Sequence, residues 1–193
     1  MPGLAHLLGE ESISSLELGS RQNGAIFDAI TEPILSAAVR ATSTLTNLSL
    51  AQVGLWDSIG IDFVDALVGH PTLEFIRFEE RLGDDADMRT LAGAALGRLV
   101  AANTPALKGL NVTGCELGDD GLRPLFAALP SNTYLGILDA ERNGISAAFA
   151  PVVLACVKAN QSLRQLYIVG YGEVSSAELR EAEALAKKRR VEG

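Results

Sequence analysis

Residues 107–134 read LKGLNVTGCELGDDGLRPLFAALPSNTY and contain one complete structural unit. The unit begins with the pattern L-x-x-L-x-L, formed by Leu107, Leu110 and Val112. Alternation of this kind predicts a strand with one buried face. Apolar spacing then changes to that of a helix, at Gly121, Leu125 and Leu129. The stretch therefore predicts a strand, a turn and a helix in that order.

The same strand pattern recurs along the chain. It begins at residues 13, 45, 73, 107, 135 and 163, so successive starts are 32, 28, 34, 28 and 28 residues apart. A recurring period is the signature of a repeat protein, in which each unit stacks on its neighbours to bury a continuous core. We therefore expect an α/β solenoid of about six repeats.

These units resemble the leucine-rich repeat family, and specifically its ribonuclease-inhibitor-like class. The resemblance covers residues 13 to about 174 and is best in the unit that begins at Leu107. It implies a curved solenoid with a parallel sheet on the concave face and helices on the convex face. The turn position that is usually Asn or Cys in this family holds Cys115 and Asn143 here. Four units depart from that pattern, with Arg21, Val53, Arg81 and Tyr171. We therefore expect an incomplete asparagine ladder.

A second, narrower resemblance is to the C-terminal repeat domain of tropomodulins. It rests on Asn103-Thr104 and Asn132-Thr133 before two repeat starts, on the long third unit and on a basic terminal helix. This resemblance implies a place in a cytoskeletal assembly.

The continuous repeat predicts a single domain over residues 1–193. Residues 1–12 are expected to cap the first repeat, because an open stack exposes its terminal core. Residues 13–174 are expected to form the repeats. Residues 175–193 are expected to form a C-terminal capping helix with a basic tail.

The composition disfavours several kinds of partner. A net charge of −8 disfavours broad attraction to nucleic acid or to anionic membranes. The N-terminal residues lack the basic region of a secretory signal, and no stretch reaches transmembrane length. The two cysteines, Cys115 and Cys156, are expected to be reduced. A cytoplasmic location is therefore expected, with a nuclear one as the alternative.

The strand pattern also predicts which side chains point out of the concave face, because side chains alternate along a strand. At the third pattern position these are Ser15, Asn47, Phe75, Gly109, Ile137 and Gln165, and at the fifth Glu17, Ser49, Arg77, Asn111, Asp139 and Tyr167. Apolar or aromatic anchors carry much of the binding energy of protein interfaces. The candidate partner-binding residues are therefore Phe75, Ile137 and Tyr167, with a polar rim of Arg77, Asp139, Glu141 and Arg142. The alternatives are that these are ordinary isolated exposed side chains, or that a terminal segment of the chain packs there.

No arrangement typical of an enzyme occurs in the sequence. It has no phosphate-binding glycine loop, no Ser or Cys nucleophile with an orienting His, and no metal-ligand cluster. Acidic residues cluster in the third unit at Glu79, Glu80, Asp84, Asp85 and Asp87, but without the order of a calcium loop. We expect Asp84 or Asp85 to cap a helix instead. We also expect His70, at a helix end, to act as a cation that favours the helix dipole.

The sequence thus predicts a non-catalytic protein-interaction module, a scaffold, adaptor or inhibitor without a cofactor, that binds a protein partner on its concave sheet. One alternative is a structural subunit of a larger or cytoskeletal assembly. Another is a microbial effector that acts on host proteins.

Overall fold

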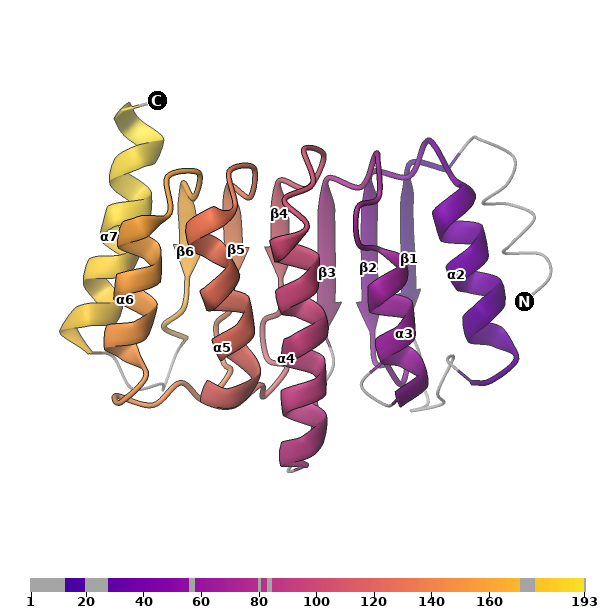
Figure 1. Cartoon of the computed structure of the whole chain (residues 1–193), viewed down its shortest axis with the longest axis horizontal. Coiled ribbons are helices and arrows are strands. Elements are labelled where there is room, and N and C mark those ends of the chain that lie inside the picture. Colours follow the sequence, from indigo (N-terminus) through magenta and orange to yellow (C-terminus); the bar gives the residue numbers. More distant parts are fainter. Residues whose placement is uncertain are drawn as a thin grey trace.

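Six strands form one parallel sheet in sequence order (Figure 1). The computed structural model describes residues 13–19, 28–55, 58–79, 81–82, 85–170 and 176–192. The strands are β1 (Ser15–Gly19), β2 (Asn47–Ala51), β3 (Phe75–Glu79), β4 (Gly109–Asn111), β5 (Ile137–Asp139) and β6 (Gln165–Tyr167). Each strand falls on one L-x-x-L-x-L pattern, and β1, β2 and β3 extend one residue past it, so the predicted strands are confirmed.

The helices form one layer over the sheet, in front of the strands in Figure 1. They are α2 (Thr31–Ala41), α3 (Ser58–Ala66), α4 (Ala86–Ala101), α5 (Gly118–Ala128), the short 3₁₀ helix η1 (Leu129–Ser131), α6 (Ala150–Ala159) and α7 (Ala177–Glu192). Strands and helices alternate along the chain. This arrangement confirms the predicted α/β solenoid of the leucine-rich-repeat type.

Neighbouring strands pair in the register that the repeat predicts. The middle row of the sheet consists of Leu16, Leu48, Ile76, Leu110, Leu138 and Leu166. All six of these side chains are buried. Since side chains alternate along each strand, the residues before and after this row point to the opposite, open face, which we call the concave face.

The core lies between the sheet and the helices. The first pattern residue of five units is buried there: Leu45, Leu73, Leu107, Leu135 and Leu163. The largest buried side chains include Phe126 and Phe149, whose rings meet edge to face with their centroids 6.1 Å apart. These residues belong to one contiguous cluster, as expected for stacked repeats.

The asparagine ladder at the turn position is incomplete, as predicted. The Asn143 amide nitrogen donates to the Val112 carbonyl at 2.9 Å, and its amide oxygen accepts from the Leu117 N–H at 3.1 Å. The Cys115 thiol donates to the Phe78 carbonyl at 3.4 Å. Val53 occupies the same position with a buried apolar side chain.

His70 is a buried hydrogen-bonding residue, and the prediction that it acts as a cation at the helix end is wrong. The residue is 4% exposed. Nε2 lies 2.9 Å from the Val39 carbonyl, which only accepts, so Nε2 carries the proton. Nδ1 accepts from the N–H groups of Thr72 and Leu73. Burial lowers the pKa of His70 below its ordinary value, although the bond to Val39 acts in the other direction.

Asn132 and Asn160 occupy the position of His70 in later repeats. The Asn132 amide nitrogen donates to the Val100 carbonyl at 2.7 Å, and its oxygen accepts from the Leu135 N–H at 2.8 Å. In the same way, the Asn160 amide nitrogen donates to the Leu129 carbonyl, and the Asn160 amide oxygen accepts from the Leu163 N–H. These side chains therefore tie the end of the helix in one repeat to the turn that follows the helix of the neighbouring repeat.

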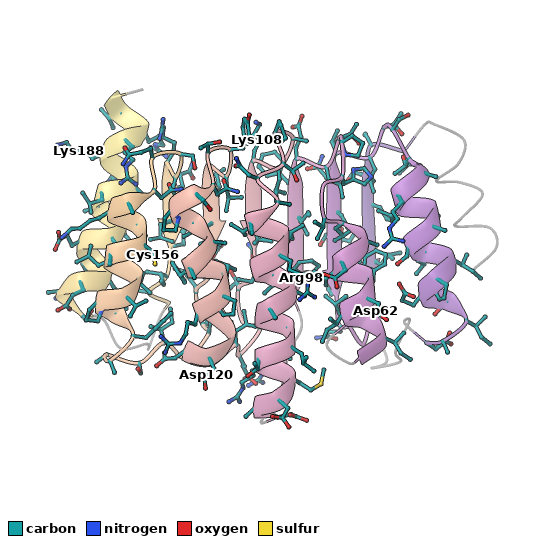
Figure 2. The ribbon with its side chains drawn as sticks, in the orientation of Figure 1. Asp62, Arg98, Lys108, Asp120, Cys156 and Lys188 are labelled. Carbon is teal, nitrogen blue, oxygen red and sulfur yellow. The ribbon has the colours of Figure 1, made fainter. Side chains whose placement is uncertain are left out.

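Two contacts hold α4 against its neighbours. On one side, a Cβ atom built on Gly93 would lie 2.1 Å from the Gly121 carbonyl oxygen, so α4 and α5 touch through their backbones. On the other side, Arg98 forms a two-pronged ion pair with Asp65 of α3, with both N–O distances 2.8 Å. Figure 2 shows Arg98 between α4 and α3.

Some sequence predictions fall outside the described residues. These are the N-terminal cap over residues 1–12, the turn positions Arg21 and Tyr171, the start of the segment 175–193, and Glu80 and Asp84 of the acidic cluster. Asp85 accepts hydrogen bonds from the N–H groups of Asp87 and Met88 and so caps α4, as predicted.

Candidate functional site

A groove of about 310 Å³ lies on the concave face. All six strands contribute to its lining, which includes Ser15, Asn47, Phe75, Gly109, Ile137 and Tyr167. The groove exists because each strand presents alternate residues to this side and the register aligns them in rows. We call this hollow the concave groove.

Two aromatic side chains stand out of the sheet in this groove. Phe75 of β3 is 40% exposed and Tyr167 of β6 is 44% exposed. Ile137 of β5 lies between their strands and is half-buried. These are the three residues predicted as apolar anchors, and they line one common surface.

The polar side chains of the groove make hydrogen bonds and ion pairs within the chain. Arg77 forms an ion pair with Glu79 at 2.6 Å. Asp139 accepts hydrogen bonds from the Asn111 amide at 3.2 Å and the Thr113 hydroxyl at 2.6 Å. Arg77 and Asp139 therefore lie beside the apolar anchors in defined orientations.

Two predicted rim residues lie elsewhere. Glu141 lines a hollow next to α7, and Arg142 lines another at the turns that follow the strands. Both residues come after β5 has ended at Asp139, so the alternation that positions the other five residues no longer applies to them. Phe75, Arg77, Ile137, Asp139 and Tyr167 are thus the predicted residues that the structure brings together.

Within the described ranges, no three His, Cys, Asp or Glu side chains are grouped so that they could hold a metal ion. The described part of the chain also contains no helix of sufficient length and apolar character to cross a membrane. Both cysteines are free thiols: Cys115 is buried, and burial raises the pKa of the half-buried Cys156.

The sequence predicted a basic tail at the end of the last helix, but it did not indicate that Arg164 and Arg180 lie beside that tail. Arg164, next to β6, and Arg180 of α7 line the same hollow as Lys187 and Arg190 near the chain end. The spacing of Arg180, Lys187 and Arg190 would place all three on one side of a helix, which is the signal in the sequence. The approach of Arg164 to them depends on tertiary packing.

The fold and the open sheet face define a leucine-rich-repeat-like solenoid. No protein-family model matches the sequence, and no curated protein gives a significant match. Among solved structures, the chain is similar to the tropomodulin C-terminal domain of Caenorhabditis elegans, with a TM-score of 0.56 and 16% identity over 99% of this chain and 93% of that chain.

The chain is also similar to a structure of leiomodin-1 actin-binding site 2. The TM-score is 0.57 and the identity 14%, over 97% of this chain and 87% of that chain. At these identities the two likenesses show the fold. They support the resemblance to tropomodulin repeat domains, whereas the ribonuclease-inhibitor-like class stays a prediction.

Proposed function

We propose that this chain is a non-catalytic protein-binding module that holds a protein partner in its concave groove. The observation that carries the proposal is the pair of exposed aromatic side chains, Phe75 and Tyr167, on one face of the sheet. Aromatic anchors surrounded by polar residues are typical of protein interfaces. Arg77 and Asp139 supply such polar neighbours.

The geometry of the groove favours binding over catalysis. Acid–base chemistry depends on a site that excludes water and holds groups with free hydrogen-bonding capacity. This groove is a shallow surface on an open sheet, and its Asp139 carboxylate already accepts bonds from Asn111 and Thr113.

Actin is the first partner to test. The leiomodin-1 structure with the same fold is described as an actin-binding site. In this reading the chain is a subunit of a cytoskeletal assembly and its concave groove contacts the actin surface. Co-sedimentation of the purified chain with actin filaments tests this choice directly.

Site-specific photo-crosslinking tests the proposal for any partner. A benzophenone amino acid at position 75 is expected to capture a protein in cells. The same group at Val152, an exposed residue of α6, is the matched control and is expected to capture much less. Equal capture from both positions, or none from position 75, would contradict binding in the concave groove.

A further inference from the structure

A larger hollow of about 640 Å³ lies at the last strand of the sheet, between β6 and α7. Its charged lining consists of Arg164, Arg180, Lys187, Arg190, Glu141 and Glu183. We call it the basic hollow. Its α7 side is formed by the helix that carries Lys188, which Figure 2 labels.

Three cations of the basic hollow have no carboxylate partner among the described residues: Arg164, Lys187 and Arg190. The Arg164 guanidinium is held in place because its Nη1 donates to the carbonyls of Gln161 and Ser162, at 2.8 and 3.1 Å. A guanidinium has five N–H donors, so Arg164 retains capacity for a carboxylate. Besides burial, the Arg164 charge lowers the pKa of Arg189, as expected where positive charge is not neutralised.

The Glu183 carboxylate is engaged with the backbone. Its Oε1 accepts from the N–H groups of Ile168 and Val169, at 2.9 and 3.2 Å. These groups follow β6 at the edge of the sheet, so α7 closes that part of the edge. A ligand of the basic hollow would therefore contact side chains and would not extend the sheet past Tyr167.

The charge of the hollow is opposite to that of the chain. Four cations and two carboxylates give it a formal charge of +2, whereas the whole chain carries −8, which leaves −10 outside the hollow. That surrounding charge repels a long polyanion or an anionic bilayer, which would extend beyond the hollow. A short acidic segment fits within it.

We propose that the basic hollow binds an acidic segment of a protein partner, with carboxylates paired to Arg164, Lys187 and Arg190. Tyr167 lines both the basic hollow and the concave groove, so the two surfaces are continuous. Binding at the basic hollow does not require a ligand in the concave groove, and the two sites can be tested separately.

The probe is a short fluorescein-labelled peptide of alternating glutamate and glycine, and the readout is fluorescence anisotropy with the full chain. The expected result is binding that weakens as salt is raised from about 0.05 to 0.5 M. Lys187→Glu is expected to raise Kd on the order of tenfold, because it replaces attraction with repulsion. Arg40→Glu makes the same change in net charge at an exposed helical cation outside the hollow and is expected to change Kd by less than about twofold.

Several outcomes would overturn the proposal. One is equal binding of the matched glutamine–glycine peptide, and another is an equal effect of Lys187→Glu and Arg40→Glu. Stronger binding to phosphatidylserine vesicles than to the peptide would assign the hollow to a membrane. If Phe75→Ala raised the Kd for the peptide as much as Lys187→Glu does, the peptide would be placed in the concave groove. Should Lys187→Glu lower the thermal melt, Arg190→Gln removes another of the three proposed cations while it preserves helix propensity, and it is also expected to raise Kd.

Discussion

The ring of Phe75 lies over the backbone of Gly109 on the neighbouring strand. A Cβ atom built on Gly109 would come within 2.5 Å of Phe75 Cδ1 and 2.8 Å of Cε1. Gly109 stands in the same row as Ile137 of β5. The missing side chain at position 109 thus lets Phe75 lean toward Ile137, which makes the apolar surface of the concave groove continuous across three strands.

The buried neutral His70 should make stability depend on pH. The pKa of His70 is lower in the folded chain than its ordinary value of 6.5. As the pH falls below 6.5, the unfolded chain therefore takes up a proton before the folded chain does. The stabilisation is complete above pH 6.5 and is lost as the pH falls through the folded-state pKa. A single proton changes the free energy of unfolding by at most about 1.4 kcal/mol per pH unit. Urea unfolding between about pH 5 and 8 measures this change.

His70→Asn is the matched variant for that experiment. Asn132 and Asn160 make the equivalent bonds in other repeats, so Asn at position 70 should preserve the fold. It should also flatten the pH dependence relative to the unmodified chain. Identical pH profiles for the two proteins would show that His70 does not titrate on unfolding as described.

Gly93→Ala should destabilise the chain by about 1–3 kcal/mol, although alanine is the better helix former. The added Cβ would meet the backbone of Gly121, which cannot move without separating α4 from α5. Gly136→Ala is the control, because its Cβ would lie an ordinary 3.7 Å from the Lys108 carbonyl oxygen. Chemical denaturation compares them, and equal stabilities would contradict the backbone contact.

The two thiols should react slowly with a disulfide reagent at neutral pH. Cys115 is fully buried, and burial raises the pKa of Cys156, which lowers its reactive thiolate fraction. Cys156, which Figure 2 shows on α6, should react first because it is only half-buried. Rapid labelling of Cys115 in the native chain would contradict its packing.

A chelator should leave the thermal melt of the chain unchanged.

Removal of residues 175–193 should lower the melting temperature or cause aggregation. This deletion takes away α7, whose Leu179, Ala182 and Ala186 are buried, and frees the N–H groups that Glu183 engages. A solenoid with an exposed terminal core is unstable or insoluble. Leu179→Ala is the milder variant, with an expected cost of about 2–5 kcal/mol. A soluble truncated chain with an unchanged melt would show that α7 is not a cap.

The pattern L-x-x-L-x-L was sufficient to predict the sheet, because a period of two identifies the buried row and the repeat length aligns the rows. It placed Phe75 and Tyr167 on the open face for that reason. It could not predict the position of Glu141, since local alternation ends with β5. The role of His70 was missed because its partner Val39 lies one repeat away in the chain. The basic tail of α7 was predicted, but the hollow that it forms with Arg164 was not, because Arg164 meets α7 only through tertiary packing.

The most direct test of the concave groove is the double change Phe75→Ala and Tyr167→Ala, measured for thermal melting and for affinity to the protein captured at position 75. Both side chains point away from the core, so the melt should change little. The affinity should fall by about 2 kcal/mol or more, as is common for aromatic anchors. Leu110 lies on the other side of the same sheet and is 1% exposed. The control variant Leu110→Ala should therefore lower the free energy of unfolding by about 2–5 kcal/mol. A double variant that melts as low as Leu110→Ala and still binds the partner would contradict the proposed concave binding surface.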